Sequence, residues 1–236
     1  MTDKIIMLTA YDYPTAKILD NAGIDIILVG DSLGNVVLGH ENTKSVTMQD
    51  MVHHTKAVSR AVNNSMLVAD MPINSYNNKT DAIENANLLI NAGAHAVKIE
   101  GRPEIVKALN NNKIKVMGHV GLLPQTAENY KVQGKEKGDA DKIMKQASDL
   151  SNAGAFSIVI ECVPEQLAKN ITETVECPTI GIGAGPHCKG QVLVLHDLIG
   201  LSEKTPSFVK PYNNIKQSIS KAVDEFKNDV KEGRFP

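Results

Sequence analysis

The chain has 236 residues, a formal net charge of -2 at pH 7, 4% aromatic residues and no tryptophan. Its length suits one large α/β domain, and the near balance of acidic and basic residues argues against a general attraction to nucleic acid or to anionic membranes. No apolar run approaches the ~20 residues of a membrane span, and residues 1–7 are too short and too polar for a signal peptide, so we expect a cytoplasmic protein that binds small molecules.

Short apolar runs alternate with segments of helical periodicity along the whole chain. The predicted strands are 5–9, 26–29, 66–69, 96–100, 115–118, 157–160, 178–183 and 192–195. The predicted helices lie near 16–22, 47–62, 80–91, 103–112, 141–152, 164–174 and 215–226. Thr47 and Asp50 have the spacing of a capping box at the start of the second helix. This alternation predicts a single (β/α)8 barrel over residues 1–236, and a doubly wound open sheet is the alternative.

One connection is longer than the others. Residues 121–139 are polar and rich in glycine and lysine, and they follow the fifth predicted strand. Long connections at the carboxyl ends of barrel strands usually carry function. We therefore expect a mobile loop over the active face.

Three acidic residues close neighbouring predicted strands: Asp31, Asp70 and Glu100. Because the carboxyl ends of parallel strands meet at one face, these acids are expected to lie side by side. Crowded carboxylates repel one another unless a cation lies among them, and oxygen ligands alone favour Mg²⁺. The simpler alternatives are that Asp31 and Ser32 cap a turn and that single acids form structural ion pairs.

Lys98 and Glu100 are two positions apart on one predicted strand, so they face the same side. The apolar residues Val97 and Ile99 are then expected to face the helices, which directs Lys98 and Glu100 into the barrel mouth. A lysine there either binds an anionic group of a substrate or, with a depressed pKa, forms a Schiff base. A salt bridge between Lys98 and Glu100 is the simpler alternative.

Two further candidates close the next strands. Glu161 follows the apolar run 158–160, and a partly enclosed carboxylate suits proton abstraction, although a rim residue bonded to a loop amide would also fit. His119 follows 116–118 and could donate to a substrate oxygen or serve a structural role. Both residues are expected at the same face as the acids.

Several phrases, in this order, resemble the ketopantoate hydroxymethyltransferase family. They are Thr-Ala-Tyr-Asp-Tyr at 9–13, Leu-Val-Gly-Asp-Ser-Leu-Gly at 28–34, Ala-Asp-Met-Pro at 69–72, Val-Lys-Ile-Glu-Gly at 97–101, Gly-His-Val-Gly-Leu at 118–122, Tyr-Lys-Val-Gln-Gly at 130–134, Glu-Cys-Val-Pro at 161–164 and Gly-Ile-Gly-Ala-Gly at 181–185. The resemblance runs from about residue 6 to residue 232. It implies a barrel of the phosphoenolpyruvate/pyruvate type. It also implies transfer of a one-carbon unit from 5,10-methylenetetrahydrofolate to 3-methyl-2-oxobutanoate, which gives 2-dehydropantoate on the route to pantothenate.

The resemblance also implies a role for each candidate residue. The implied Mg²⁺ ligands are Asp31 and Asp70, with Glu100 bound directly or through water, and the implied keto-acid contacts are Asp31, Ser32, Asp70 and Lys98, with His119 close by. Glu161 would be the base. A keto acid that chelates Mg²⁺ through its carboxylate and ketone oxygens has an acidified C3 proton, because the cation holds the developing enolate charge. The enolate carbon would then attack the methylene unit of the folate.

The chain departs from the family pattern in two places. Family members usually carry an additional N-terminal helix that contributes to subunit contacts, whereas this sequence starts almost at its first strand. We expect a homo-oligomer, and the decamer typical of the family is the reference state. Between Gln125 and Tyr130 the chain is about three residues shorter than the family pattern, so loop closure and folate affinity could differ.

Two other interpretations stay open at this point. One is a different enzyme, either a Schiff-base aldolase that uses Lys98 or another Mg²⁺-dependent carbon-carbon lyase of the pyruvate type. The other is a barrel that binds a ligand without turnover. The presence of every candidate acid and of Lys98 argues against the second interpretation.

Overall fold

A computed structural model of the chain, which describes residues 4–236, contains a closed barrel of parallel strands. The strands follow one another around the barrel in sequence order, and β8 pairs with β1 to close it. They are β1 Ile5–Thr9, β2 Ile26–Val29, β3 Met66–Asp70, β4 Ala96–Lys98, β5 Val116–Gly121, β6 Ser157–Glu161, β7 Thr179–Ile182 and β8 Gly190–Leu193. The predicted (β/α)8 barrel is confirmed, and the open sheet is excluded.

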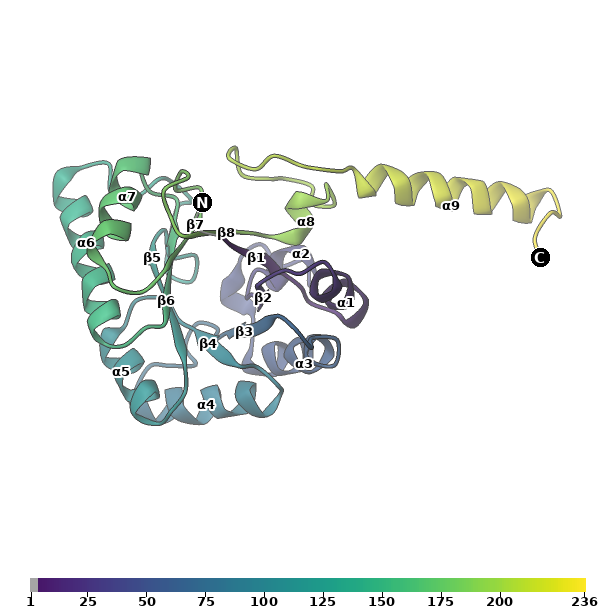
Figure 1. Cartoon of the computed structure of the whole chain (residues 1–236). Helices are drawn as coiled ribbons and strands as arrows, with labels where there is room; N and C mark the ends of the chain where they lie inside the picture. The colour runs from purple at the N-terminus through teal and green to yellow at the C-terminus, as the bar shows by residue number, and fades with distance from the viewer. Residues whose placement is uncertain (1–3) are drawn as a thin grey trace. The chain divides into compact units, whose positions relative to one another are not determined.

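Helices surround the strands on the outside of this barrel (Figure 1). They are α1 Tyr13–Asn21, α2 Leu33–Val36, α3 Met48–Ser59, α4 Lys79–Asn91, α5 Pro103–Asn111, α6 Lys137–Asn152 and α7 Glu165–Thr174, with a 3-10 helix η1 at Thr43–Ser45. Residues 183–189, all of which the structure describes, join β7 to β8 without a helix. The apolar faces of α1 and of α3 to α7 are buried, so the barrel has buried side chains on both sides of its wall.

Local chemistry fixes where several helices begin and end. The capping box predicted for α3 is confirmed, because Thr47 Oγ1 accepts from the Asp50 N–H and Asp50 Oδ2 accepts from the Thr47 N–H. At α1, Asp12 caps the N-terminus through the Thr15 N–H. The chain leaves α1 at Gly23 with a φ of 77°, a conformation that glycine adopts without strain.

Some boundaries differ from the prediction. Strand β8 lies two residues earlier than the predicted 192–195. Its ladders with β1 and β7 begin at Gly190, and it ends at Leu193 because Leu195 starts the short helix α8, Leu195–Leu198. Strand β5 continues to Gly121, since its ladder with β6 extends past the glycine and histidine residues that interrupt its apolar run. The connection after β2 contains α2 and η1, which are too short to produce a detectable period.

The interior of the barrel is a layer of apolar side chains contributed by every strand. Its buried members are Met7, Ile26, Leu28, Val68, Ala96, Met117, Val159, Ile180 and Val192. Because side chains alternate along a strand, the residue two positions after each of these also faces the interior, one layer closer to the carboxyl end. This layer therefore packs beneath the inward-facing side chains at the carboxyl end of the barrel.

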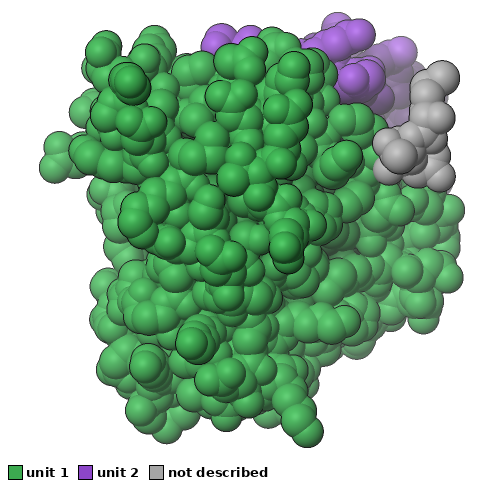
Figure 2. All heavy atoms as spheres, turned by 60° about the vertical axis from the view of Figure 1, so that its left-hand side comes forward, with its two compact units in different colours: residues 1–193 green, residues 194–236 purple. Residues whose placement is uncertain are grey.

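The chain divides into two compact units, one that ends at Leu193 and one that runs from Val194 onward (Figure 2). The second unit contains α8 and α9, Ile215–Lys231, which confirms the helix predicted near 215–226. The prediction of a single domain over residues 1–236 stays a prediction. None of the helices between residues 4 and 236 is long and apolar enough to cross a membrane.

Candidate active site

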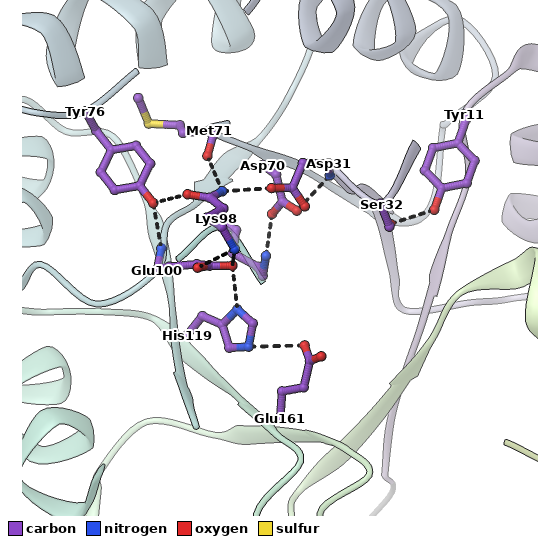
Figure 3. Close-up of polar contacts among 11 residues, drawn as sticks. Tyr11, Asp31, Ser32, Asp70, Met71, Tyr76, Lys98, Glu100, His119 and Glu161 are labelled. Atoms are coloured by element: carbon purple, nitrogen blue, oxygen red, sulfur yellow. Dashed lines mark hydrogen bonds and ion pairs between the residues drawn. The ribbon is translucent and has the colours of Figure 1, made fainter. Parts of the chain in front are cut away.

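The alternation of side chains along the strands explains why four polar side chains point into the barrel. The inward residues Val68, Ala96, Met117 and Val159 are followed two positions later by Asp70, Lys98, His119 and Glu161. These four side chains point into the barrel at its carboxyl end, where Asp31 and Glu100 join them (Figure 3). The predicted inward orientation of Lys98 is confirmed, because Ala96 on the same strand lies in the interior core.

Lys98 and Asp70 form a buried ion pair. The two residues are register partners on β4 and β3, and Lys98 Nζ lies 2.6 Å from Asp70 Oδ1, with side chains 7% and 3% exposed. Burial opposes the charged form of Lys98, but the carboxylates of Asp70, Asp31 and Glu100 outweigh it and hold the pKa of Lys98 above its ordinary value. Lys98 is therefore a fixed positive charge, and its ion-pair partner is Asp70 and not Glu100, the partner that the simpler alternative named.

Asp31 reaches the site through the turn after β2. Its backbone N–H donates to Asp70 Oδ2 at 3.0 Å, which holds the Asp70 carboxylate against the Asp31 backbone. A Cβ atom at Gly30 would lie 2.8 Å from Ser32 Oγ, so glycine there leaves room for the turn. Burial, followed by the nearby Asp70 carboxylate, raises the pKa of Asp31.

Glu100 lies just past β4 and is 6% exposed. Burial is the main cause that raises its pKa, and the carboxylates of Asp31 and Asp70 add to the shift although Lys98 opposes it. Its Oε2 accepts the backbone N–H of Gln125 at 3.2 Å. Three buried acids and only one buried lysine thus share this end of the barrel, so a further positive charge would stabilise the cluster.

The acids suit a hard divalent cation, although they do not form a complete three-residue ligand set. Among residues 4–236, no three His, Cys, Asp or Glu side chains are grouped so that they could hold a metal ion as they stand. Mg²⁺ typically takes one or two carboxylates and keeps several waters. Asp31 and Asp70, adjacent and oxygen-only, fit that requirement. Whether Glu100 binds the ion directly or through water stays a prediction.

His119 lies between Glu100 and Glu161 (Figure 3). Its Nδ1 is 3.7 Å from Glu100 Oε1 and its Nε2 is 3.3 Å from Glu161 Oε2, and neither contact has hydrogen-bond geometry. Complete burial lowers the pKa of His119, which favours the neutral imidazole, although Glu161 opposes the shift. The Glu161 side chain is 18% exposed, so it is open to a ligand at the barrel mouth.

The remaining predicted residue, Ser32, points toward a different partner. Its Oγ lies 2.8 Å from Tyr11 Oη, with which it shares a hydrogen bond. Tyr11 is 2% exposed, and burial raises the pKa of its phenol, so it stays protonated. The Tyr11–Ser32 pair fixes the hydroxyl group beside Asp31.

Comparison with known proteins identifies the family. The sequence profile of ketopantoate hydroxymethyltransferase matches residues 1–236. The chain belongs to the ketopantoate hydroxymethyltransferase family. It is similar to the 3-methyl-2-oxobutanoate hydroxymethyltransferase of Thermoanaerobacter sp. (strain X514), with 54% identity over 99% of this chain and 88% of that protein. The protein of the same name from Pyrobaculum aerophilum is 54% identical over 98% of this chain and 91% of its own length.

Solved structures that resemble the chain share the barrel fold. Phosphoenolpyruvate phosphomutase from Streptomyces platensis subsp. rosaceus superposes with a TM-score of 0.68 at 14% identity, over 99% of this chain and 85% of that one. Phosphonopyruvate hydrolase in complex with oxalate and Mg²⁺ gives a TM-score of 0.66 at 15% identity, over 98% and 84%. At such low identity the likeness supports the fold alone. The family membership makes this chain an enzyme on a (β/α)8 barrel.

Two side chains at the barrel mouth of this chain, Gln125 and Tyr76, were not predicted from the sequence. Gln125 donates from Nε2 to Asp31 Oδ2 at 2.8 Å, and the Tyr76 hydroxyl donates to Gln125 Oε1. Neither residue carries a charge, and both lie in connections and not at a strand end. Their only signal in the sequence was a position in loops that follow β3 and β5, where binding residues collect.

Proposed function

We propose that the chain transfers a hydroxymethyl group from 5,10-methylenetetrahydrofolate to 3-methyl-2-oxobutanoate and so makes 2-dehydropantoate for pantothenate synthesis. The observation that carries this proposal is the convergence of Asp31, Asp70, Lys98 and Glu161 at one end of the barrel in a chain of this family. The names of the relatives specify the keto acid. A solved structure with this fold, that of a phosphonopyruvate hydrolase, contains oxalate and Mg²⁺, and a site for a cation and a small organic acid in this chain is in keeping with it.

The residues present would bind the keto acid at its charged end. Lys98 stays protonated and offers a fixed charge to the substrate carboxylate, and the Ser32 hydroxyl offers a further hydrogen bond. Asp31 and Asp70 would hold Mg²⁺, which when bound supplies positive charge that acidifies the C3 proton of a chelating keto acid. Burial of this cluster strengthens each of these interactions.

Glu161 would remove the C3 proton. Its carboxylate stands at the end of β6, partly exposed to the mouth, with neutral His119 beside it. The electron pair of the broken C–H bond becomes that of the enolate, and the enolate carbon then forms a bond to the methylene carbon of the folate. The two carbon–nitrogen bonds of that methylene break, and one water supplies the hydroxyl oxygen. The two nitrogens gain one proton each, in balance with the C3 proton and one proton of the water, and tetrahydrofolate leaves.

The loop after β5 would receive the folate. A cavity of about 460 Å³ is lined by residues of this loop between Gly121 and Gln133. Gly121 is the register partner of Glu161, so the cavity adjoins the strand end that carries the base. A donor bound there would present its methylene carbon on the Glu161 side of the keto acid.

Product analysis tests the proposal directly. The chain, Mg²⁺, 3-methyl-2-oxobutanoate and 5,10-methylenetetrahydrofolate should together yield 2-dehydropantoate, and EDTA should abolish its formation. Turnover that persists in EDTA would remove the cation from the proposal. A complete reaction mixture that gives no 2-dehydropantoate would overturn the proposed function.

The Schiff-base aldolase is the principal rival and is disfavoured by the state of Lys98. An imine requires a neutral amine, whereas Lys98 is paired with Asp70 at 2.6 Å and its pKa is raised. Borohydride added with the keto acid reduces an imine to a permanent adduct. We expect no adduct at Lys98, and a mass increase on that residue would favour the aldolase.

The net charge of -2 and the scarcity of aromatic residues support small-molecule ligands over nucleic acid. We propose a cytoplasmic homo-oligomer, which sedimentation velocity would test by a mass above the 25.5 kDa of one chain.

A further inference from the structure

We propose that Gln125 is a positioning residue that holds the carboxylates of Asp31 and Glu100 in place for a divalent cation. The inference rests on the proposed function, since it takes a cation bound at Asp31 and Asp70 as its starting point. It adds a residue on the loop after β5 to a site otherwise built from strand ends.

Gln125 is buried in a loop whose next residue is exposed. Its residue exposure is 2%, and the Thr126 and Ala127 N–H groups both bond the Leu123 carbonyl, which makes a tight turn around it. An amide that is buried so completely must have its donors and acceptor satisfied. The turn therefore directs the Gln125 side chain into the protein, where its amide group must form hydrogen bonds with other residues and not with solvent.

Every polar atom of the Gln125 side chain has a partner at the acidic cluster. Nε2 donates to Asp31 Oδ2 at 2.8 Å and to the Met71 carbonyl at 2.9 Å. Oε1 accepts from the Tyr76 hydroxyl. In addition the Gln125 backbone N–H donates to Glu100 Oε2 at 3.2 Å. One loop residue thus touches two of the three acids.

The orientation of the amide is determined by its neighbours. The Met71 carbonyl can only accept, so the group that faces it is the NH₂. The Tyr76 hydroxyl accepts the Glu100 N–H at 3.4 Å, which leaves its own proton for Gln125 Oε1. A flipped amide would place oxygen against a carbonyl and a carboxylate. The donors of Gln125 therefore point at Asp31.

A neutral donor suits this position better than a charged one. A second lysine would compete with the cation for the carboxylates, whereas an amide orients a carboxylate and leaves its charge intact. Partners of this kind fix the geometry of metal ligands, and their loss typically weakens metal binding by roughly 10- to 100-fold. Gln125 also links the loop after β5 to the site through its contacts with Asp31 and Glu100.

The test measures cation binding without either substrate. Gln125→Met keeps the length and volume of the side chain and removes its donors and its acceptor. We expect Mn²⁺ titrated into this variant and followed by electron paramagnetic resonance to bind roughly 10- to 100-fold more weakly than in the unchanged chain. Saturating Mg²⁺ should restore much of the turnover, a rescue that a merely structural defect would not show. Gln166→Met, on the exposed face of α7, is the matched control and should bind Mn²⁺ normally.

A second variant guards against a folding failure. Tyr76→Phe removes the hydroxyl that donates to Gln125 Oε1 and keeps the ring, so it should weaken Mn²⁺ binding in the same direction by a smaller factor. Circular dichroism establishes that each variant is folded.

The outcomes separate this inference from the proposed function. If the unchanged chain binds Mn²⁺ and makes 2-dehydropantoate while folded Gln125→Met and Tyr76→Phe bind the ion as tightly, the role of Gln125 is wrong and the proposed function stands. If the unchanged chain binds no Mn²⁺, the inference and the cation of the proposed function fail together.

Discussion

At the scale of single residues, Glu161 differs from the other acids in its surroundings. Asp31, Asp70 and Glu100 are crowded together with Lys98, whereas Glu161 has His119 as its near neighbour and keeps an 18% exposed side chain. Of these four acids, Glu161 is the one best placed to exchange a proton with a ligand at the barrel mouth. The imidazole of His119 thus separates Glu161, the proposed base, from Glu100 of the acidic cluster.

Replacement of Glu161 separates binding from proton transfer. We expect Glu161→Gln to keep Mg²⁺ and 3-methyl-2-oxobutanoate binding, because its side chain is isosteric and lies apart from the Asp31 and Asp70 carboxylates. Exchange of the C3 proton into deuterated water, followed by NMR, should slow by about 10² to 10⁴-fold. Glu165→Gln, an exposed residue that pairs with His187, is the matched control and should exchange normally. Normal exchange in Glu161→Gln would remove this residue from the role of base.

Asp20 offers a residue-scale test of stability against pH. It is 2% exposed and accepts the backbone N–H groups of Asn64 and Ser65, both at 2.9 Å, so it ties α1 to the start of β3. Burial would raise the pKa of Asp20, but these hydrogen bonds outweigh it and lower the pKa from 3.8 to about 2. A carboxyl with a depressed folded-state pKa stabilises the fold above its unfolded pKa, and this contribution is lost as pH falls from about 4 to about 2.

The corresponding measurement is urea unfolding of Asp20→Asn at pH 7 and at pH 3. We expect the variant to lose roughly 1 kcal/mol at pH 7, the typical net contribution of a hydrogen bond, and to lose less at pH 3, where the unchanged chain has lost part of the same interaction. Asp141→Asn, exposed on α6, serves as the control. A loss that is the same at both pH values would contradict the account given for Asp20.

At the scale of elements, helix α3 depends on its capping box. Thr47→Ala removes the acceptor for the Asp50 N–H and should lower the free energy of unfolding by ~1 kcal/mol, measured by urea denaturation. Thr80→Ala, an exposed substitution within α4, should cause no comparable loss. Equal losses in the two variants would mean that a general effect of losing threonine outweighs the cap.

Strands and helices were predictable from the sequence where the pattern of apolar residues indicates which faces are buried. Strands such as β2 are continuous apolar runs because both faces are covered, and the polar residue that ends each run marks the barrel rim. Helix α2 could not be predicted, because four residues give no period and its geometry depends on packing around Leu33. The sequence offered a salt bridge between Lys98 and Glu100 only as an alternative, and it could not identify Asp70 as the partner, because it contains no information on the β3–β4 register that places Asp70 beside Lys98.

The site shows the same division. Charged residues at strand ends were identified because charge at the end of an apolar run is conspicuous. Gln125 was not, because its role depends on a contact with Asp31 across 94 positions of sequence. Neutral side chains that orient charged ones leave almost no local signal, and only the folded chain brings them together.

At the scale of the whole molecule, the proposed ligands would join strands that are far apart in sequence. Asp31 follows β2, Asp70 ends β3, Lys98 ends β4 and Glu161 ends β6, so a bound cation and keto acid would contact a large part of the barrel wall. A ligand that binds only the folded barrel stabilises it by mass action. We therefore expect ligands bound at the site to raise the stability of the whole barrel.

Calorimetry in Mg²⁺ and 3-methyl-2-oxobutanoate tests this linkage. At ligand concentrations about 100-fold above Kd the stabilisation is ~2.7 kcal/mol, which corresponds to a rise in Tm of about 5–10 °C for a chain of this size. EDTA should cancel the rise, whereas EDTA without keto acid and Mg²⁺ should change the Tm little. Because we predict one domain over residues 1–236, a single transition should move as a whole. A second transition whose Tm the ligands leave unchanged would mean that the unit from Val194 onward unfolds separately. The one-domain prediction would then be wrong.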